Sequence, residues 1–147
     1  MRFLILNGPN INFLGIREPE IYGGRTYQDL LAYIEKNANE LGVECEFYQS
    51  NHEGSLVDAI QGAYGRSANK IDGIVINPAA YTHTSVAILD ALKAVGLPAA
   101  EVHLSDVTKR EDFRQVSYAG MACCAHFIGL GFDGYIEAIK YLIQKLS

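Results

Sequence analysis

The sequence predicts an α/β fold in which helices cover both faces of a parallel β-sheet. Short apolar runs rich in β-branched residues alternate with longer segments whose apolar residues recur at helical spacing. This alternation is typical of parallel sheets, because the connecting helix returns the chain to the same end of the sheet. The length of 147 residues and the 49% hydrophobic content suit one domain, which we expect to span residues 1–147.

Five runs are predicted to be strands because they are short, largely apolar and followed by turn residues. The first stops at Gly8 and Pro9, and the third stops at Asn77 and Pro78. The predicted strands are residues 2–6, 43–48, 71–76, Ala99–His103 and 123–128.

The segments between the strands, and the last segment of the sequence, are predicted to be helices. In the first of them, Leu30, Ile34 and Ala38 repeat at helical spacing, and Gly42 ends the helix. Gly96 closes the third in the same way. The predicted helices are residues 26–41, 55–68, 85–95 and 135–146, with one or two helical turns within 110–116.

Five strands in this order suit a flavodoxin-like three-layer sandwich with the strand order 2-1-3-4-5. Right-handed crossover connections leave few other topologies. The sequence contains no internal repeat, low-complexity stretch or linker that would divide it. In sheets of this kind, ligands bind beyond the carboxyl ends of the strands.

Composition and charge exclude several classes of function. A net charge of -5 argues against a nucleic-acid partner, which usually requires a basic face. No apolar run is long enough to cross a membrane, and the apolar start of the sequence is too short for a signal peptide. The three cysteines form a poor disulfide framework. We therefore expect a soluble, cytoplasmic protein with reduced thiols.

Motifs for common cofactors are missing from the sequence. No G-x-G-x-x-G follows the first strand, and no G-x-x-x-x-G-K-[ST] occurs anywhere, which argues against a dinucleotide or a nucleotide phosphate loop. Cys123, Cys124 and His126 would face different sides of a strand, so we do not expect a zinc site there. No cofactor and no metal are expected.

Polar residues follow the strands that should meet at one edge of the sheet. Each has a simpler explanation when it is taken alone: the asparagines as turn residues, His83 as a capping or surface residue, His103 as a structural histidine and Arg17 as a solvated charge. Their joint arrival at one edge favours a site for an anionic ligand. The residues are Asn7, Asn10, Arg17, Tyr22, Asn77, His83, Glu101, His103, Ser105, Arg110 and Arg114.

The motifs that carry these residues resemble those of the type II dehydroquinases, along nearly the whole sequence and in the same order. They are N-G-P-N-I-N-F-L-G-I-R-E-P-E-I-Y-G (7–23), Q-S-N-H-E-G-S-L (49–56), I-N-P-A-A-Y-T-H-T-S (76–85), E-V-H-L-S (101–105), R-E-D-F-R (110–114) and G-L-G-F-D-G-Y (129–135). The resemblance implies a cofactor-free enzyme of the shikimate pathway that eliminates water from 3-dehydroquinate, through an enolate, to give 3-dehydroshikimate. It leaves open whether the role is aromatic amino acid biosynthesis or quinate breakdown.

The resemblance also implies a role for each matching residue. Tyr22 would remove the proton beside the ketone, Arg17 would hold that tyrosine as phenolate, and His103 would protonate the leaving hydroxyl group. Glu101 would partner His103, while Asn10 and, through a water, Asn77 would support the enolate. The implied substrate-binding positions are Asn77, His83, Leu104, Ser105 and Arg114, with Arg114 on the carboxylate.

Assembly is a further implication of the resemblance. Family members form dodecamers built from four trimers, and Asp90 matches a residue that reaches the site of a neighbouring subunit. The segment 12–25, which carries Arg17 and Tyr22, could close over the substrate as a lid.

This sequence departs from the family at a few positions that are not catalytic. Asp106, Thr108 and Lys109 differ from the residues of many relatives, and Ala79 and Ala80 replace a glycine pair. Two other functions remain open: a non-enzymatic module that binds a small anion, and a different lyase of hydroxy-acids. A binding module would need the arginines but would have no use for a base and an acid.

Overall fold

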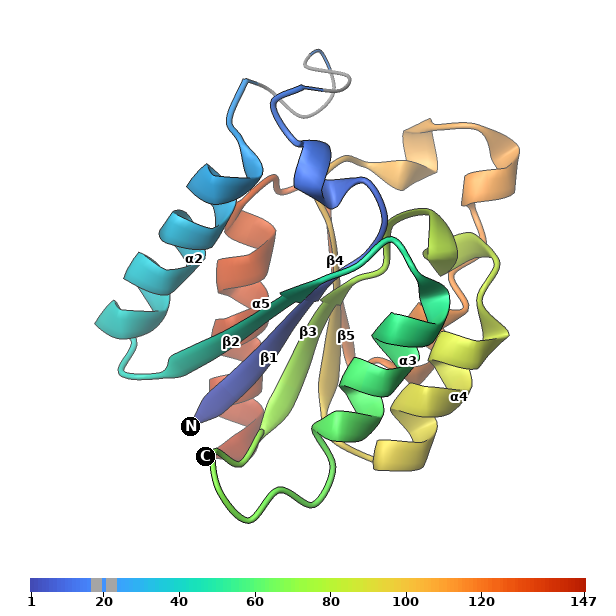
Figure 1. Cartoon of the computed structure of the whole chain (residues 1–147). Helices are drawn as coiled ribbons and strands as arrows, with labels where there is room; N and C mark the ends of the chain where they lie inside the picture. Colours follow the sequence, from blue (N-terminus) through green and yellow to red (C-terminus); the bar gives the residue numbers. More distant parts are fainter. Residues whose placement is uncertain (17–19, 21–23) are drawn as a thin grey trace.

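The computed structural model, which describes residues 1–16, 20 and 24–147, contains a five-stranded parallel sheet with the order β2-β1-β3-β4-β5 (Figure 1). This confirms the predicted flavodoxin-like topology. The chain places β2 on one side of β1 and places β3, β4 and β5 on the other side, so the strand order reverses between β1 and β3. The strands are β1 (Arg2–Asn7), β2 (Glu44–Gln49), β3 (Gly73–Asn77), β4 (Ala99–His103) and β5 (Ala125–Ile128).

Two pairs of helices cover the two faces of the sheet, as Figure 1 shows: α2 (Tyr27–Glu40) with α5 (Asp133–Leu146), and α3 (Glu53–Gly62) with α4 (Val86–Val95). Each pair closes its own hydrophobic core against the sheet. Strand β4 supplies Ala100 and Val102 to the core under α2 and α5, and it supplies Ala99 to the other core. By alternation, Glu101 and His103 point to the same face as Ala99.

Local signals set the helix ends. Thr26 and Asp29 form a reciprocal capping box at the start of α2. The Ser85 hydroxyl accepts a hydrogen bond from the Ile88 N–H at the start of α4, and Gly96 ends that helix in the left-handed conformation, with φ of 67°. None of the helices in the described part of the chain is long and apolar enough to cross a membrane.

Several predicted boundaries were wrong. The second predicted helix, 55–68, is α3 at Glu53–Gly62, and the chain turns at Gly65 with φ of 66°, which other residues rarely adopt. The fifth strand starts at Ala125 rather than at 123, because the Cys123 N–H donates to the Gly120 carbonyl in a 3-10 turn. The helical turn predicted within 110–116 is a 3-10 turn, η4 (Asp112–Arg114). Four other 3-10 turns were not predicted: η1 (Ile11–Phe13), η2 (Ala79–His83), η3 (Val107–Lys109) and η5 (Ala119–Ala122).

The loops that follow β1 and β3 approach each other closely at the reversal of strand order. The Gly8 N–H donates to the Asn77 carbonyl at 2.8 Å. A Cβ added at Gly8 would lie 2.3 Å from the backbone oxygen of Pro78. Glycine is therefore required where these two loops bring Asn10 and Asn77 to the same edge.

We expect Gly8→Ala to lower the free energy of unfolding by about 1–3 kcal/mol, because the new methyl group overlaps backbone that cannot move aside easily. Urea denaturation at neutral pH measures this. Gly54→Ala is the matched control: it lies in the first turn of α3 with open space around it, so roughly 0.5–1 kcal/mol of added stability is expected. Equal stability of the Gly8 variant and the wild type would contradict the steric argument.

Candidate active site

A pocket opens at the carboxyl ends of β1, β3 and β4, where ligands bind in sheets of this topology. Its volume is about 170 Å³. Because a cavity of about 150 Å³ in another protein holds one benzene molecule, this pocket has room for one six-membered ring. It is lined by Pro9, Asn10, Ile11, Asn77, Ala79, Ala80, His83, His103, Leu104, Ser105, Val107, Arg110 and Arg114.

A buried carboxylate stands behind the pocket wall. Glu101 is 1% exposed, and its Oε1 lies 2.7 Å from Nε2 of His103, which lines the pocket. The expected pairing of these two β4 residues is confirmed, and it follows from their position two residues apart on one strand face. The Ser117 hydroxyl donates to the same oxygen at 2.5 Å, and Nδ1 of His126 lies 2.7 Å from Oε2.

These hydrogen bonds determine the charge of Glu101 and the tautomer of His103. Burial raises the pKa of the Glu101 carboxyl, but the hydrogen bonds from His103 and Ser117 and the charge of His103 outweigh burial and lower that pKa to about 2. An ionised carboxylate only accepts, so Nε2 of His103 must carry a hydrogen. The ring nitrogen that remains for a ligand is Nδ1, and a proton held there would be stabilised by the carboxylate behind it.

Backbone packing holds this carboxylate in place. A Cβ at Gly120 would lie 2.4 Å from Oε2 of Glu101 and 2.7 Å from Oγ of Ser117. The Gly120 N–H also donates to that Ser117 oxygen at 3.0 Å. Turn η5 can therefore pack directly on the carboxylate only because residue 120 has no side chain. Neither Ser117 nor Gly120 was singled out in the sequence, since they follow a loop and carry no recognisable motif.

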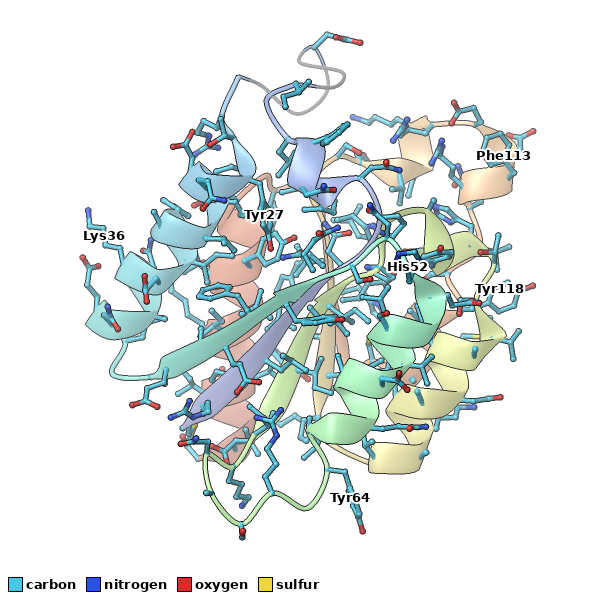
Figure 2. The ribbon with its side chains drawn as sticks, viewed as in Figure 1. Tyr27, Lys36, His52, Tyr64, Phe113 and Tyr118 are labelled. Carbon is cyan, nitrogen blue, oxygen red and sulfur yellow. The ribbon has the colours of Figure 1, made fainter. Side chains whose placement is uncertain are left out.

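The outer wall of the pocket is cationic. Arg110 and Arg114 both line it, with side chains that are 15% and 24% exposed. Nε of Arg114 donates to Glu111 at 2.5 Å, which fixes the guanidinium, and its carbon lies 5.0 Å from the ring centre of Phe113. Figure 2 shows Phe113 on the outer side of this segment, pointing away from the sheet. The two arginines and the absence of a carboxylate among the described lining residues suit an anionic ligand.

His83, at the end of η2, is arranged as a neutral acceptor. Its Nδ1 lies 2.8 Å from the Val116 carbonyl oxygen, which can only accept, so Nδ1 carries the hydrogen. Burial lowers the pKa of His83, and the nearby His103 and Arg114 lower it further. The neutral ring then offers Nε2 as an acceptor for a hydroxyl group.

A buried network orients Asn77. Its Nδ2 donates to the Tyr135 hydroxyl at 3.0 Å, its Oδ1 accepts from the Ala79 N–H at 3.1 Å, and the Tyr135 hydroxyl donates to Oδ1 of Asn7 at 2.6 Å. All the atoms of the Asn77 amide are thus assigned by their partners. Burial raises the pKa of the Tyr135 hydroxyl above its usual value, so this group stays protonated as the donor to Asn7.

Two lining residues adopt a conformation that non-glycine residues rarely adopt. Asn10 has φ of 68° and Ala79 has φ of 53°. Strained backbone of this kind concentrates at ligand sites. The Asn10 N–H donates to Oδ1 of Asn51 at 3.0 Å, so the end of β2 also contributes, as its motif suggested.

The structure brings together eight of the predicted site residues in the pocket lining: Asn10, Asn77, His83, His103, Leu104, Ser105, Arg110 and Arg114. Glu101 stands directly behind them. Asp90 is exposed on α4 and does not line this pocket. Arg17 and Tyr22, and with them residues 17–19 and 21–23 of the proposed lid, lie outside the described residues. Among the residues that are described, no group of three His, Cys, Asp or Glu side chains could hold a metal ion.

Fold and site together define a flavodoxin-like protein with a small cationic pocket and a carboxylate-paired histidine. Residues 1–143 match the family model described as dehydroquinase class II. The chain belongs to the class II dehydroquinase family.

Known relatives match the sequence of this chain over nearly their full length. The chain is 50% identical to the 3-dehydroquinate dehydratase of Clostridium acetobutylicum, covering all of this chain and 99% of the relative. It is 51% identical to the protein of the same name from Caldicellulosiruptor bescii, covering 99% of both. The crystal structure of a type II dehydroquinase from Butyrivibrio crossotus superposes with a TM-score of 0.93 at 49% identity over 97% of both chains.

The lowered pKa of Glu101 predicts acid sensitivity. An ordinary glutamate has a pKa of 4.5, against about 2 here, so the ionised form stabilises the folded state by roughly 3 kcal/mol above the higher value. This contribution is lost as the pH falls from about 5 toward 2. Glu101→Gln removes it, because one side of the amide is a donor that faces another donor.

The measurement is the free energy of unfolding in urea as a function of pH. The wild type should lose stability through this acid range more steeply than Glu101→Gln, which should be the less stable protein at neutral pH. Glu53→Gln, in the first turn of α3, serves as the control for removing one glutamate. Parallel curves for the wild type and Glu101→Gln would refute the prediction.

Proposed function

We propose that the pocket at the ends of β1, β3 and β4 is where this chain eliminates water from 3-dehydroquinate. The family and the full-length relatives make the chain a hydro-lyase, a type II 3-dehydroquinate dehydratase of the shikimate pathway. The observation that carries the assignment to this pocket is the ionised Glu101 behind His103. The pair places a proton donor in a pocket that has arginines on its outer wall and room for one six-membered ring.

The reaction needs a base, support for an enolate and an acid. In the proposed mechanism, the Tyr22 phenolate, stabilised by Arg17, takes the proton beside the ketone, and the electron pair moves to the ketone oxygen. Asn10 and a water held by Asn77 donate to that oxygen. When the enolate collapses, the bond from carbon to hydroxyl breaks, and the hydroxyl leaves as water with the proton from Nδ1 of His103. No cofactor is assigned to any step.

Substrate binding follows from the charges and donors of the lining. Arg114 has the fork that binds a carboxylate through two hydrogen bonds, and Arg110 adds a second positive charge. Neutral His83 accepts from a substrate hydroxyl group. Leu104 and Ser105, which directly follow β4, complete the proposed contacts.

The proposal extends to the organisation of the protein. We assign residues 1–147 to one catalytic domain, place the enzyme in the cytoplasm and propose a dodecamer of four trimers. Asp90 supports this assembly, because it is an exposed carboxylate on α4 outside its own pocket, available to a neighbouring subunit. Light scattering on the purified wild type should give twelve-chain particles; a monomer with full activity would contradict the assembly and the role of Asp90.

The central experiment adds chelator-treated protein to 3-dehydroquinate and follows the ultraviolet absorbance of the conjugated enone product. We expect a rise with the wild type that is insensitive to the chelator and is abolished by Tyr22→Phe, which lacks the base. A rise that persists in Tyr22→Phe would keep the function but refute the base. No rise with folded wild type would leave an anion-binding module as the better explanation.

The same assay tests Arg114 separately from the base. Arg114→Lys keeps the charge but loses the bidentate fork, so KM should rise by about tenfold, the size of one charge-assisted hydrogen bond. Arg66→Lys is the matched control, because Arg66 pairs with Glu46 of β2 and does not line this pocket. An unchanged KM in Arg114→Lys would remove Arg114 from the carboxylate site.

A further inference from the structure

Glu101 has a second histidine partner that the proposed reaction does not use. Residues Glu101 and His126 are register partners on the neighbouring strands β4 and β5. Nδ1 of His126 lies 2.7 Å from Oε2 of Glu101, while His103 and Ser117 share Oε1. The side chain of Glu101 is 2% exposed and that of His126 is 47% exposed. A continuous chain of hydrogen bonds therefore leads from the surface of β5 through a buried carboxylate to the pocket.

The hydrogen bond from His126 restricts the rotation of the Glu101 carboxylate. A carboxylate can rotate about its last bond, and a donor on Oε2 resists that rotation while Oε1 stays directed at His103. Gly120 packs against the same Oε2, so this oxygen is enclosed from the side of η5 as well. Since Glu101 is ionised, Nδ1 of His126 must carry a hydrogen, and Nε2 is the atom that gains a proton when the ring becomes charged.

We propose that His126 is a positioning residue for the dehydration: it holds Glu101 toward His103 and competes with His103 for the charge of that single carboxylate. This proposal rests on the function assigned to the pocket above. A charged His126 neutralises part of the negative charge that stabilises protonated His103. By reciprocity, protonation of His103 disfavours protonation of His126 to the same extent.

Among the described residues, no other group that faces this network competes with His103 for the charge of Glu101 in the way that His126 does. Ser117 is an uncharged donor. The Cys123 thiol lies close enough for Glu101 to affect it, but burial and the charge of Glu101 both raise its pKa, so it stays neutral. On the pocket side, His83 interacts with both His103 and Arg114, and because His83 is neutral, Arg114 supplies the fixed positive charge there. Neither group contacts Glu101 by a hydrogen bond, whereas His126 acts through that shared carboxylate.

Two substitutions separate the hydrogen bond from the charge. In His126→Asn, the amide nitrogen takes the position of Nδ1 and still donates to Oε2, but no proton can be gained. In His126→Val, both the donor and the charge are lost, with a β-branched residue that suits a strand. We expect kcat to fall by about tenfold in His126→Val with KM almost unchanged, and to stay near the wild-type value in His126→Asn. A purely structural role would not distinguish these two variants at equal folded content.

The decisive measurement is the NMR titration of the imidazole protons in wild type, His126→Asn and His103→Asn. Two coupled histidines lose their protons in two steps that belong to the pair. The lower wild-type step should lie below the single step of either variant, because both charged rings then share one carboxylate. A lower step that coincides with the step of one variant would overturn the proposal, as would equal kcat values for His126→Val and His126→Asn.

Failure of the proposed function would look different. The titrations need no substrate, so they report on the coupling even if the wild type gives no enone product. If His126→Val does not fold, the comparison of wild type with the two asparagine variants still decides the question. A rise in KM at unchanged kcat in His126→Val would place His126 on substrate binding and would also overturn the proposal.

Discussion

The ionised carboxylate of Glu101, buried between the sheet and η5, is the constraint on which the rest of the site depends. A buried charge is costly unless every oxygen is hydrogen-bonded, and here His103, Ser117 and His126 supply the donors. Because Gly120 lacks a side chain, backbone can close over it. The same interactions that stabilise the charge also fix the tautomer of His103, so stability and chemistry rest on the same hydrogen bonds.

The parallel sheet explains why so few residues make a complete pocket. All five strands end at one edge, and the reversal of strand order between β1 and β3 opens a crevice there. Gly8 allows the two loops to touch, and the left-handed conformations of Asn10 and Ala79 turn the chain into the pocket. The arginines of the 107–114 segment then close the open side with positive charge.

Prediction from the sequence worked best where the signal was local. The strands and the glycine stop at Gly96 follow from propensity and spacing, and the strand order follows from the right-handed crossover rule. The end of α3 and most of the 3-10 turns were missed, because such short turns have no periodicity to detect. Tyr135 was predicted only as the first residue of the last helix, and nothing in the sequence indicated that its hydroxyl orients Asn77.

The sequence by itself determined the fold class, the strand order, the family and which polar residues reach the edge of the sheet, because these depend on alternation, turn residues and ordered motifs. Only the tertiary structure decided which of those residues touch. The bond from His126 to Glu101 joins residues 25 positions apart, and that from Asn7 to Tyr135 joins residues 128 apart. Such contacts depend on strand register and on helix packing, so they, and the pKa of Glu101 that they produce, cannot be read from neighbouring residues in the chain.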